Sequence, residues 1–193
     1  MKKPILKEVT QITDTQYTNM YLYNYEYNKK QVPYYVTSRR KMTKQNANKA
    51  VADAVIVLPY IIKDNKTYIV FIKEFRYAVN SFIYDIPAGL IDKGETPQEA
   101  AVRELSEEIG ATCKNLTPCT TLSYVTPGCF NEGSITFFAQ VELDKPQALE
   151  EGEIIDLHIL PLEEVIDFVD NNIMGVQGKM MTKIFYYQQK CKK

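Results

Sequence analysis

Apolar and polar residues alternate in the first forty positions of the chain, and this pattern predicts strands. Tyrosines alternate with other residues at 21–27 (YLYNYEY), the polar NKKQ follows, and VPYYVTS continues at 32–38. Alternation on both sides of a polar turn is typical of an antiparallel hairpin with one aromatic face. Since a two-stranded hairpin is only marginally stable alone, we expect this face to pack on the rest of the chain or on a second subunit, and we favour the second subunit.

A second pair of apolar stretches predicts the start of the main domain. ADAVIVLPYI at 52–61 and YIVFIKEF at 68–75 flank the polar turn DNK, and the polar KMTKQNANK at 41–49 separates them from the aromatic hairpin. We therefore expect a small antiparallel sheet over residues 1–48 and the main domain over residues 49–193.

The stretch 97–109 carries the clearest helix signals. Thr96 and Glu99 form a capping-box pattern. Pro97 takes the first helical position, and Gly110 supplies the stop. The apolar stripe of this helix is expected to face the core, which leaves its glutamates towards a cleft. The stripe consists of Ala101, Val102, Leu105 and Ile109.

The remaining pattern predicts a mixture of strands and helices. Strands are expected at 119–125, 134–142 and 154–160, and helices at 162–172 and 179–189. Strands with helices on either side indicate an α/β sandwich with a mixed sheet.

Composition and charge narrow the class of protein. A chain of 193 residues with 45% hydrophobic residues can bury one substantial core, with room for a small accessory module. The 23 basic and 24 acidic residues give a formal net charge of −1, which argues against general binding to nucleic acid or to a membrane surface. The longest apolar run, at 54–62, is too short to span a bilayer, and the first residues lack the apolar core of a signal peptide. We therefore expect a cytoplasmic protein.

Cysteine and histidine usage argues against several kinds of catalytic centre. The four cysteines include no CxxC pair, so we expect reduced thiols and no zinc site or disulfide framework. His158 is the only histidine, and in the alternating segment IIDLHIL we expect it to be packed or at the surface. Ser-His-Asp and multi-histidine zinc mechanisms are therefore poor fits.

Three glutamates crowd one face of the predicted helix. Glu104 has Glu107 and Glu108 as its neighbours three and four positions on, so their like charges repel. No cation lies between Glu104 and Gly110, and only Arg103 flanks them. One interpretation is a solvated acidic face, and the other is a platform for a cation.

The stretch GLIDKGETPQEAAVRELSEEIGA at 89–111 resembles the Nudix box, the signature of the Nudix hydrolase family. The specified positions are all filled at their spacings: Gly89, Glu95, Arg103, Glu104, Leu105, Glu107, Glu108, Gly110 and Ala111. The resemblance implies a Nudix α/β/α sandwich with a mixed sheet, here with the small N-terminal antiparallel sheet added. It also favours the cation platform, with Mg²⁺ as the cofactor and Mn²⁺ as the alternative.

The same resemblance implies roles for individual residues. The metal ligands would be the carbonyl of Ala88 and the carboxylates of Glu104, Glu108 and Glu153, with Glu107 as an additional ligand or a group that orients water. Arg103 is expected to orient a glutamate such as Glu95 and not to touch substrate.

The flanks of the box resemble the ADP-ribose pyrophosphatase branch of the family. KEFRYAVNSFIYDIPAGLIDKGE supplies the arginine of that branch at Arg76, and Pro127 lies 127 − 111 = 16 residues beyond the box. Cys129 and Asn131 depart from the usual loop after this proline, which leaves selectivity for the base and sugar open. By the resemblance, the substrate-binding residues would be Arg39, Arg40, Arg76 and Glu132.

The acidic stretch ALEEGE resembles the loop that delivers the catalytic base in that branch. Glu151 and Glu153 reproduce a Glu-x-Glu arrangement, and we expect Glu151 to be the base. Glu150, Glu153 and the helical Glu107 are the rivals, and a solvated acidic turn is the non-functional alternative.

The function that the resemblance implies is the metal-dependent hydrolysis of a small nucleoside diphosphate derivative. ADP-ribose, cleaved to AMP and ribose 5-phosphate, is the first choice, and another nucleotide sugar or a dinucleotide is the alternative. A ligand sensor that binds without cleaving is the rival outside enzymes, but such modules commonly lose box glutamates that this chain keeps. The branch also implies a homodimer built through the N-terminal sheet, with no nucleic-acid or membrane partner.

Overall fold

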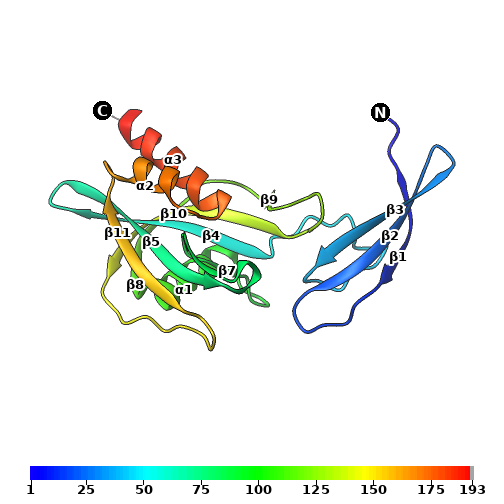
Figure 1. Cartoon of the computed structure of the whole chain (residues 1–193), viewed down its shortest axis with the longest axis horizontal. Coiled ribbons are helices and arrows are strands. Elements are labelled where there is room, and N and C mark those ends of the chain that lie inside the picture. The colour runs from blue at the N-terminus through cyan, green and yellow to red at the C-terminus, as the bar shows by residue number, and fades with distance from the viewer. Residues whose placement is uncertain (192–193) are drawn as a thin grey trace. The chain divides into compact units, whose positions relative to one another are not determined.

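The computed structural model describes residues 1–191, which form two compact units (Figure 1). The smaller unit contains residues 1–53 and 122–134, and the larger unit contains the rest. The predicted boundary at 48/49 lies close to the end of the first segment. The segment 122–134, which the sequence analysis assigned to the main domain, instead packs with the smaller unit.

The smaller unit contains a three-stranded antiparallel sheet with the order β1-β2-β3. Its strands are β1 (Ile5–Gln11), β2 (Asn19–Tyr27) and β3 (Lys30–Ser38). The turn between β2 and β3 places Asn28 and Lys29 at φ values of 51° and 63°, which match the right-handed twist of the flanking strands. The hairpin was predicted, but β1 was not.

The aromatic face of β2 is covered within the smaller unit. Tyr21 and Tyr23 are 1% and 3% exposed and form a cluster with Met42, against which Leu6 and Val9 of β1 pack. The third strand therefore supplies part of the cover that a hairpin lacks, so neither a second subunit nor the larger unit is needed to bury these two rings.

The larger unit is built on a mixed sheet whose main strands run in the order β11-β5-β4-β10-β8. These strands are β4 (Ala54–Lys63), β5 (Lys66–Arg76), β8 (Ala111–Pro118), β10 (Gly133–Leu143) and β11 (Ile155–Pro161). Three short strands extend the sheet: β6 (Ser81–Asp85) pairs with β5, β7 (Ala88–Leu90) with β4, and β9 (Ser123–Tyr124) with β10. A single 3-10 turn, η1 (Tyr77–Val79), connects β5 to β6.

The strands β4 and β5 pair only near their shared turn, and this positions β7. Residues 60–63 of β4 pair with residues 66–69 of β5. Beyond this ladder, β4 pairs with β7 and β5 pairs with β6. The chain therefore enters the Nudix-box stretch from a strand, β7, that is hydrogen-bonded to the central sheet.

Helices cover both faces of this sheet (Figure 1). α1 (Pro97–Ile109) packs on one face, and α2 (Val165–Asn171) with α3 (Val176–Cys191) packs on the other. Alternate residues of β4 separate the two layers, since Val55 and Val57 join the α1 cluster while Ile56 and Leu58 join the α2 and α3 cluster. The predicted α/β/α sandwich is confirmed.

Some predicted elements were wrong in detail. The strand expected at 119–125 is displaced, because the edge strand β8 ends at Pro118 and β9 covers only Ser123–Tyr124. An edge strand with polar residues on its open face gives little alternation to detect. In α1, Val102 is 42% exposed and does not join the apolar stripe, whereas Ala100 is fully buried.

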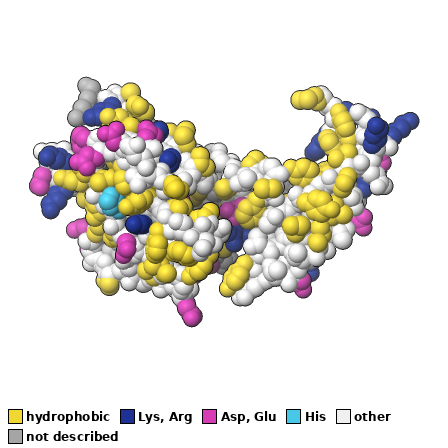
Figure 2. Space-filling model, in the orientation of Figure 1, with side chains coloured by type: hydrophobic (Ala, Val, Ile, Leu, Met, Phe, Trp, Pro, Cys, Tyr) yellow, Lys and Arg dark blue, Asp and Glu magenta, His cyan; other side chains and the backbone are white. Residues whose placement is uncertain are grey.

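The charged surface, the four cysteines and His158 show no unusual feature. Acidic and basic side chains are interspersed over the visible face of the larger unit (Figure 2). The four cysteines are free thiols, and the ring of His158 stacks on Phe168 with 4.9 Å between the centroids. Among residues 1–191, no helix combines the length and apolar character needed to cross a membrane.

Candidate active site

The helix that carries the crowded glutamates is fixed at both ends by its own sequence. Thr96 Oγ1 accepts a hydrogen bond from Glu99 N at 3.2 Å, and Glu99 Oε2 accepts one from Thr96 N at 2.8 Å. This capping box satisfies two N–H groups that the first helical turn leaves free. Gly110 ends the helix in the left-handed conformation, with a φ of 61°.

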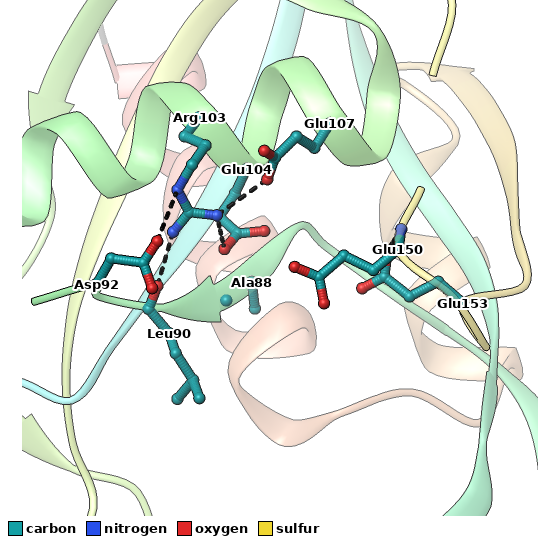
Figure 3. Close-up of a pocket in the computed structure, with 9 residues that line it drawn as sticks. Ala88, Leu90, Asp92, Arg103, Glu104, Glu107, Glu150 and Glu153 are labelled. Atoms are coloured by element: carbon teal, nitrogen blue, oxygen red, sulfur yellow. Dashed lines mark hydrogen bonds and ion pairs between the residues drawn. The ribbon is translucent and has the colours of Figure 1, made fainter. Parts of the chain in front are cut away.

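Arg103 is the centre of the network on this helix (Figure 3). It donates two hydrogen bonds to Glu95, from Nε at 3.0 Å and from Nη2 at 3.1 Å. Nη1 donates to Glu104 at 2.7 Å and to Glu107 at 2.9 Å, and Nη2 also donates to the carbonyl of Leu90 at 2.8 Å. The contact expected between Arg103 and Glu95 is present, and it ties the loop before the helix to the helix itself. The hydrogen bonds from Arg103 also lower the pKa of Glu95.

Two of the predicted ligand carboxylates are buried beside the backbone of β7. Glu104 and Glu108 are 7% and 4% exposed, and Ala88 N donates to Glu108 Oε2 at 3.3 Å. A methyl group at Gly89 would lie only 1.8 Å from Glu104 Oε1. The glycine is therefore required for the Glu104 carboxylate to lie this close to the strand.

The corner before Ala88 is held by Asp85. Its Oδ1 accepts a hydrogen bond from Ile86 N at 3.0 Å, and a methyl group at Gly175 would lie 2.3 Å from its Oδ2. Burial raises the pKa of this carboxyl group. The contact links the start of the Nudix-box stretch to the segment just before α3 and so fixes where β7 begins.

The carboxylates of this region carry more negative charge than nearby cations balance. Burial, and then the charges of Glu104, Glu74 and Glu153, raise the pKa of Glu108 well above its usual value. Burial also raises the pKa of Glu104, and it raises the pKa of Glu74 to about 7. Buried carboxylate oxygens in such a cluster are the hard ligands that a divalent cation prefers. The donor set therefore fits such a cation.

The side chains of the predicted metal ligands are not arranged around one common position. In the part of the chain that the structure describes, no three acidic, histidine or cysteine side chains are arranged to hold a metal ion. For Glu104 and Glu107 the cause is Arg103, because both carboxylates are hydrogen-bonded to its guanidinium group (Figure 3).

A cleft of about 270 Å³ opens beside these glutamates. Its lining comprises Ala88, Gly89, Leu90, Asp92, Arg103, Glu104, Glu107, Glu150 and Glu153. Glu150 and Glu153 reach it from the acidic loop, on another side from the α1 side chains (Figure 3). Glu151, which the sequence analysis favoured as the base, is exposed and does not line the cleft, whereas its rival Glu150 does.

Sequence analysis missed Glu74. This residue is 8% exposed on β5, and its Oε1 lies 2.7 Å from Nη2 of Arg76. Glu74 follows the buried Val70 and Ile72 at alternate positions of β5, so a charged residue on the apolar face of a predicted strand was the available signal. The predicted substrate-binding residue Arg76 is thus paired with a carboxylate that influences the pKa of Glu108.

The other predicted substrate-binding residues lie in the smaller unit. Arg39 Nε lies 2.5 Å from Glu132 Oε2, so these two residues are brought together. Arg40 turns elsewhere, with its Nε 3.0 Å from Asp53 Oδ1 and its Nη2 donating to the carbonyl of Asn131 at 3.1 Å. Arg40 therefore joins three segments of the smaller unit, which gives it a structural role.

Aromatic side chains of the smaller unit surround a pocket of about 250 Å³. Tyr23, Tyr25, Tyr34, Tyr124 and Phe130 belong to its lining. The hydroxyl of Tyr23 is buried and has no hydrogen-bond partner within residues 1–191, and burial raises its pKa to about 12. The lining of the pocket is therefore mainly aromatic, and the Tyr23 hydroxyl is buried beneath it.

Comparisons with known proteins agree with the site. The family model described as NUDIX domain matches residues 51–182. An uncharacterized Nudix hydrolase of Schizosaccharomyces pombe is 30% identical over 94% of this chain and 91% of its own length. An ADP-ribose pyrophosphatase of Bacillus subtilis is 36% identical over 53% of this chain, and a putative Nudix hydrolase of Caenorhabditis elegans is 32% identical over 63% of it. The chain spans only 56% and 57% of these last two relatives.

The fold also matches a solved structure over nearly its whole length. The crystal structure of an ADP compounds hydrolase covers 98% of this chain, and the chain covers 97% of that protein, with a TM-score of 0.77 and 22% identity. At this identity the match concerns the fold alone.

Proposed function

The chain belongs to the Nudix hydrolase family, and from this premise we propose that it hydrolyses a nucleoside diphosphate derivative, with ADP-ribose as the first candidate substrate. The products would be AMP and ribose 5-phosphate. The observation that carries the proposal is the buried carboxylate platform of α1, whose charge calls for a cation, beside a cleft that a second acidic segment also lines. Several relatives are named as ADP-ribose pyrophosphatases, among them the one of Bacillus subtilis, which supports the choice of substrate.

Nudix hydrolases generally need divalent metal ions, and we assign Mg²⁺, with Mn²⁺ as the alternative, to this platform. Glu104, Glu108, Glu153 and the carbonyl of Ala88 would hold the cation. When bound, it would neutralise charge on the bridging phosphates and lower the pKa of a water molecule. Arg103 would keep Glu95, Glu104 and Glu107 in place and would not touch substrate.

The catalytic base is assigned to the acidic loop. A carboxylate that shares its lone pairs with a cation is a weak base, so a residue outside the ligand set is the better candidate. Glu150 lines the cleft and Glu153 is allotted to the cation, which makes Glu150 the first choice and Glu151 the second. The base would accept the proton of the attacking water as the bond to phosphorus forms.

The smaller unit would recognise the nucleoside and build a homodimer. The aromatic pocket beside Tyr25, Tyr34 and Phe130 offers ring faces on which an adenine could stack. In a homodimer, Arg39, paired with Glu132, would contact phosphate or ribose at the site of the partner subunit, and Arg76, paired with Glu74, would do so at the site of its own subunit. The exposed side chains of β3, which include Val32 and Tyr35, are the surface we assign to the dimer, and light scattering of the full chain tests that assignment.

A substrate panel tests the proposal directly. The full chain with Mg²⁺ would be given ADP-ribose, other ADP-sugars, GDP-mannose and diadenosine polyphosphates, and release of the nucleoside monophosphate would be followed by chromatography. The highest kcat/KM is expected for ADP-ribose. A higher value for another compound would move the assignment to that substrate, and saturable binding without any cleavage would indicate a ligand sensor.

A further inference from the structure

The acidic turn at residues 150–153 is closed on itself by two hydrogen bonds. Glu153 N donates to the carbonyl of Glu150 at 3.1 Å, and Glu150 N donates to Glu153 Oε2 at 2.8 Å. The second bond occupies one oxygen of the Glu153 carboxylate, Oε2, within the turn. The Glu150 carboxylate, in contrast, has no hydrogen bond or ion pair with any residue that the structure describes. The position of this free carboxylate therefore depends on how the turn as a whole is held.

On one side the loop is anchored to the end of α1. Ala148 N donates to the carbonyl of Glu107 at 2.8 Å, and Gln147 Nε2 donates to the carbonyl of Glu108 at 2.6 Å. These carbonyls lie in the last turn of α1, where carbonyl groups have no hydrogen-bond partner within the helix. The same two residues, Glu107 and Glu108, also contribute carboxylates to the acidic face of α1. The loop is thus placed with reference to the platform itself.

On the other side the loop is anchored to β5 and η1. Phe75 N donates to the carbonyl of Ile154 at 3.2 Å, and the hydroxyl of Tyr77 donates to the carbonyl of Gly152 at 3.0 Å. The side chain of Gln147 reaches this side too, because Nε2 also donates to the carbonyl of Ile155 at 3.4 Å. The side-chain amide of Gln147 therefore links α1 to β11, the strand that begins after the turn.

We propose that Gln147 is a positioning residue for the reaction, because its side chain closes the acidic loop at both ends and holds the Glu150 carboxylate at the cleft. This inference rests on the proposed function, since it assigns Gln147 a role through the proposed base. Neither Gln147 nor its amide lines the cleft, so the residue acts without touching substrate. A shift of the turn by about 1 Å can cost on the order of 100-fold in rate.

The test compares three variants of the full chain. Gln147→Met keeps the length of the side chain and removes its donor. Gln147→Lys restores a donor, and a cation is favourable at the end of a helix. Gln188→Met makes the same change at an exposed position of α3 and serves as the matched control. We expect Gln147→Met to lower kcat by on the order of 10-fold with little change in KM, Gln147→Lys to recover most of the loss, and Gln188→Met to behave as the wild type.

Two readouts separate positioning from general damage. Mn²⁺ affinity, measured by calorimetry without substrate, is expected to fall much less than kcat in Gln147→Met, because Glu104 and Glu108 keep their places on α1 and only the contribution of Glu153 is affected. In a Glu150→Gln background, Gln147→Met should cost almost nothing further, because both changes remove the same contribution. A fall in Mn²⁺ affinity parallel to kcat, or full additivity of the two substitutions, overturns the proposal.

Hydrogen exchange makes the result independent of catalysis. Gln147→Met should accelerate exchange of the amides at 148–153 relative to Gln188→Met, while amides of α1 keep their protection. Unchanged exchange at 148–153 contradicts the proposal even if the enzyme is active. If the wild type cleaves nothing in the substrate panel while exchange responds as expected, the proposed function fails and the loop-closing role of Gln147 stands.

Discussion

The α1 platform and the acidic turn both bring carboxylates to one cleft, but they are held in different ways. The platform residues Glu104 and Glu108 are 7% and 4% exposed and sit on a helix with a capping box and a glycine stop. The acidic turn is exposed, and mostly its backbone carbonyls and amides hold it to neighbouring elements. The proposed ligands Glu104 and Glu108 are thus buried on a helix, whereas the proposed base Glu150 and the proposed ligand Glu153 lie on an exposed turn.

The α1 platform and the acidic turn also differ in their electrostatics. Burial raises the pKa values of Glu104 and Glu108, so the charged forms of these two carboxylates are disfavoured until a cation is present. The glutamates of the turn, in contrast, are exposed to solvent. Substitutions of Glu104 and Glu108 should therefore change cation binding, whereas substitution of Glu150 should change turnover alone.

The largest effect is expected for Glu108→Gln. Removing this charge takes away a proposed ligand and should lower kcat by on the order of 100-fold or more, with weaker Mn²⁺ binding. The fold should survive, because a neutral amide is easier to bury than a carboxylate with a raised pKa. Steady-state kinetics, calorimetry and circular dichroism check the three parts, and an activity within threefold of wild type would contradict the expectation.

Next in size is Glu150→Gln, in the turn. Loss of the base should lower kcat by about 100-fold while KM and Mn²⁺ affinity stay near their wild-type values. Glu151→Gln is the matched control, since it removes the same charge from an exposed residue outside the cleft. If Glu151→Gln is inactive and Glu150→Gln is not, the base is Glu151, as the sequence alone indicated.

Gly89→Ala probes the backbone contact of the platform. The added methyl group would overlap Glu104 Oε1, so the carboxylate must move, and we expect kcat to fall on the order of 10-fold together with Mn²⁺ affinity. At Gly128 a methyl group meets nothing within 4 Å, so Gly128→Ala controls for stability and Mn²⁺ binding. Equal Mn²⁺ affinity in the two variants would show that the Gly89 contact is irrelevant to the platform.

The smallest effect is thermal. A cation present at 100 times its dissociation constant stabilises the protein that binds it by about 2.7 kcal/mol, a shift of a few degrees in Tm. Wild type and Glu150→Gln should show this shift with Mg²⁺ relative to EDTA, and Glu108→Gln should show less of it. Equal shifts in all three proteins would remove the distinction between platform and turn.

Sequence was sufficient for the platform because its signals are local and periodic. The capping residues, the glycine stop and the spacing of the glutamates all lie within 89–111, and the structure keeps them on one helix. The mixture of strands and helices also predicted the sandwich, in which β4 is covered on both faces.

The acidic turn was less predictable because its geometry comes from distant residues. Three neighbouring glutamates in ALEEGE look equivalent in sequence, and only the bonds from Tyr77 and Phe75, with those to Glu107 and Glu108, decide which one reaches the cleft. The contacts of Arg40 could not be predicted for the same reason, since its partner Asp53 lies outside any motif.

Phosphorus NMR of the full chain with ADP-ribose tests the central claim most directly, namely that a cation held by the α1 platform is required for hydrolysis of the diphosphate. With Mg²⁺, the two diphosphate signals should be replaced by the two monoester signals of AMP and ribose 5-phosphate, and EDTA or Glu108→Gln should leave the diphosphate intact over the same time. Cleavage that continues at the same rate in EDTA, or in Glu108→Gln, would contradict the account.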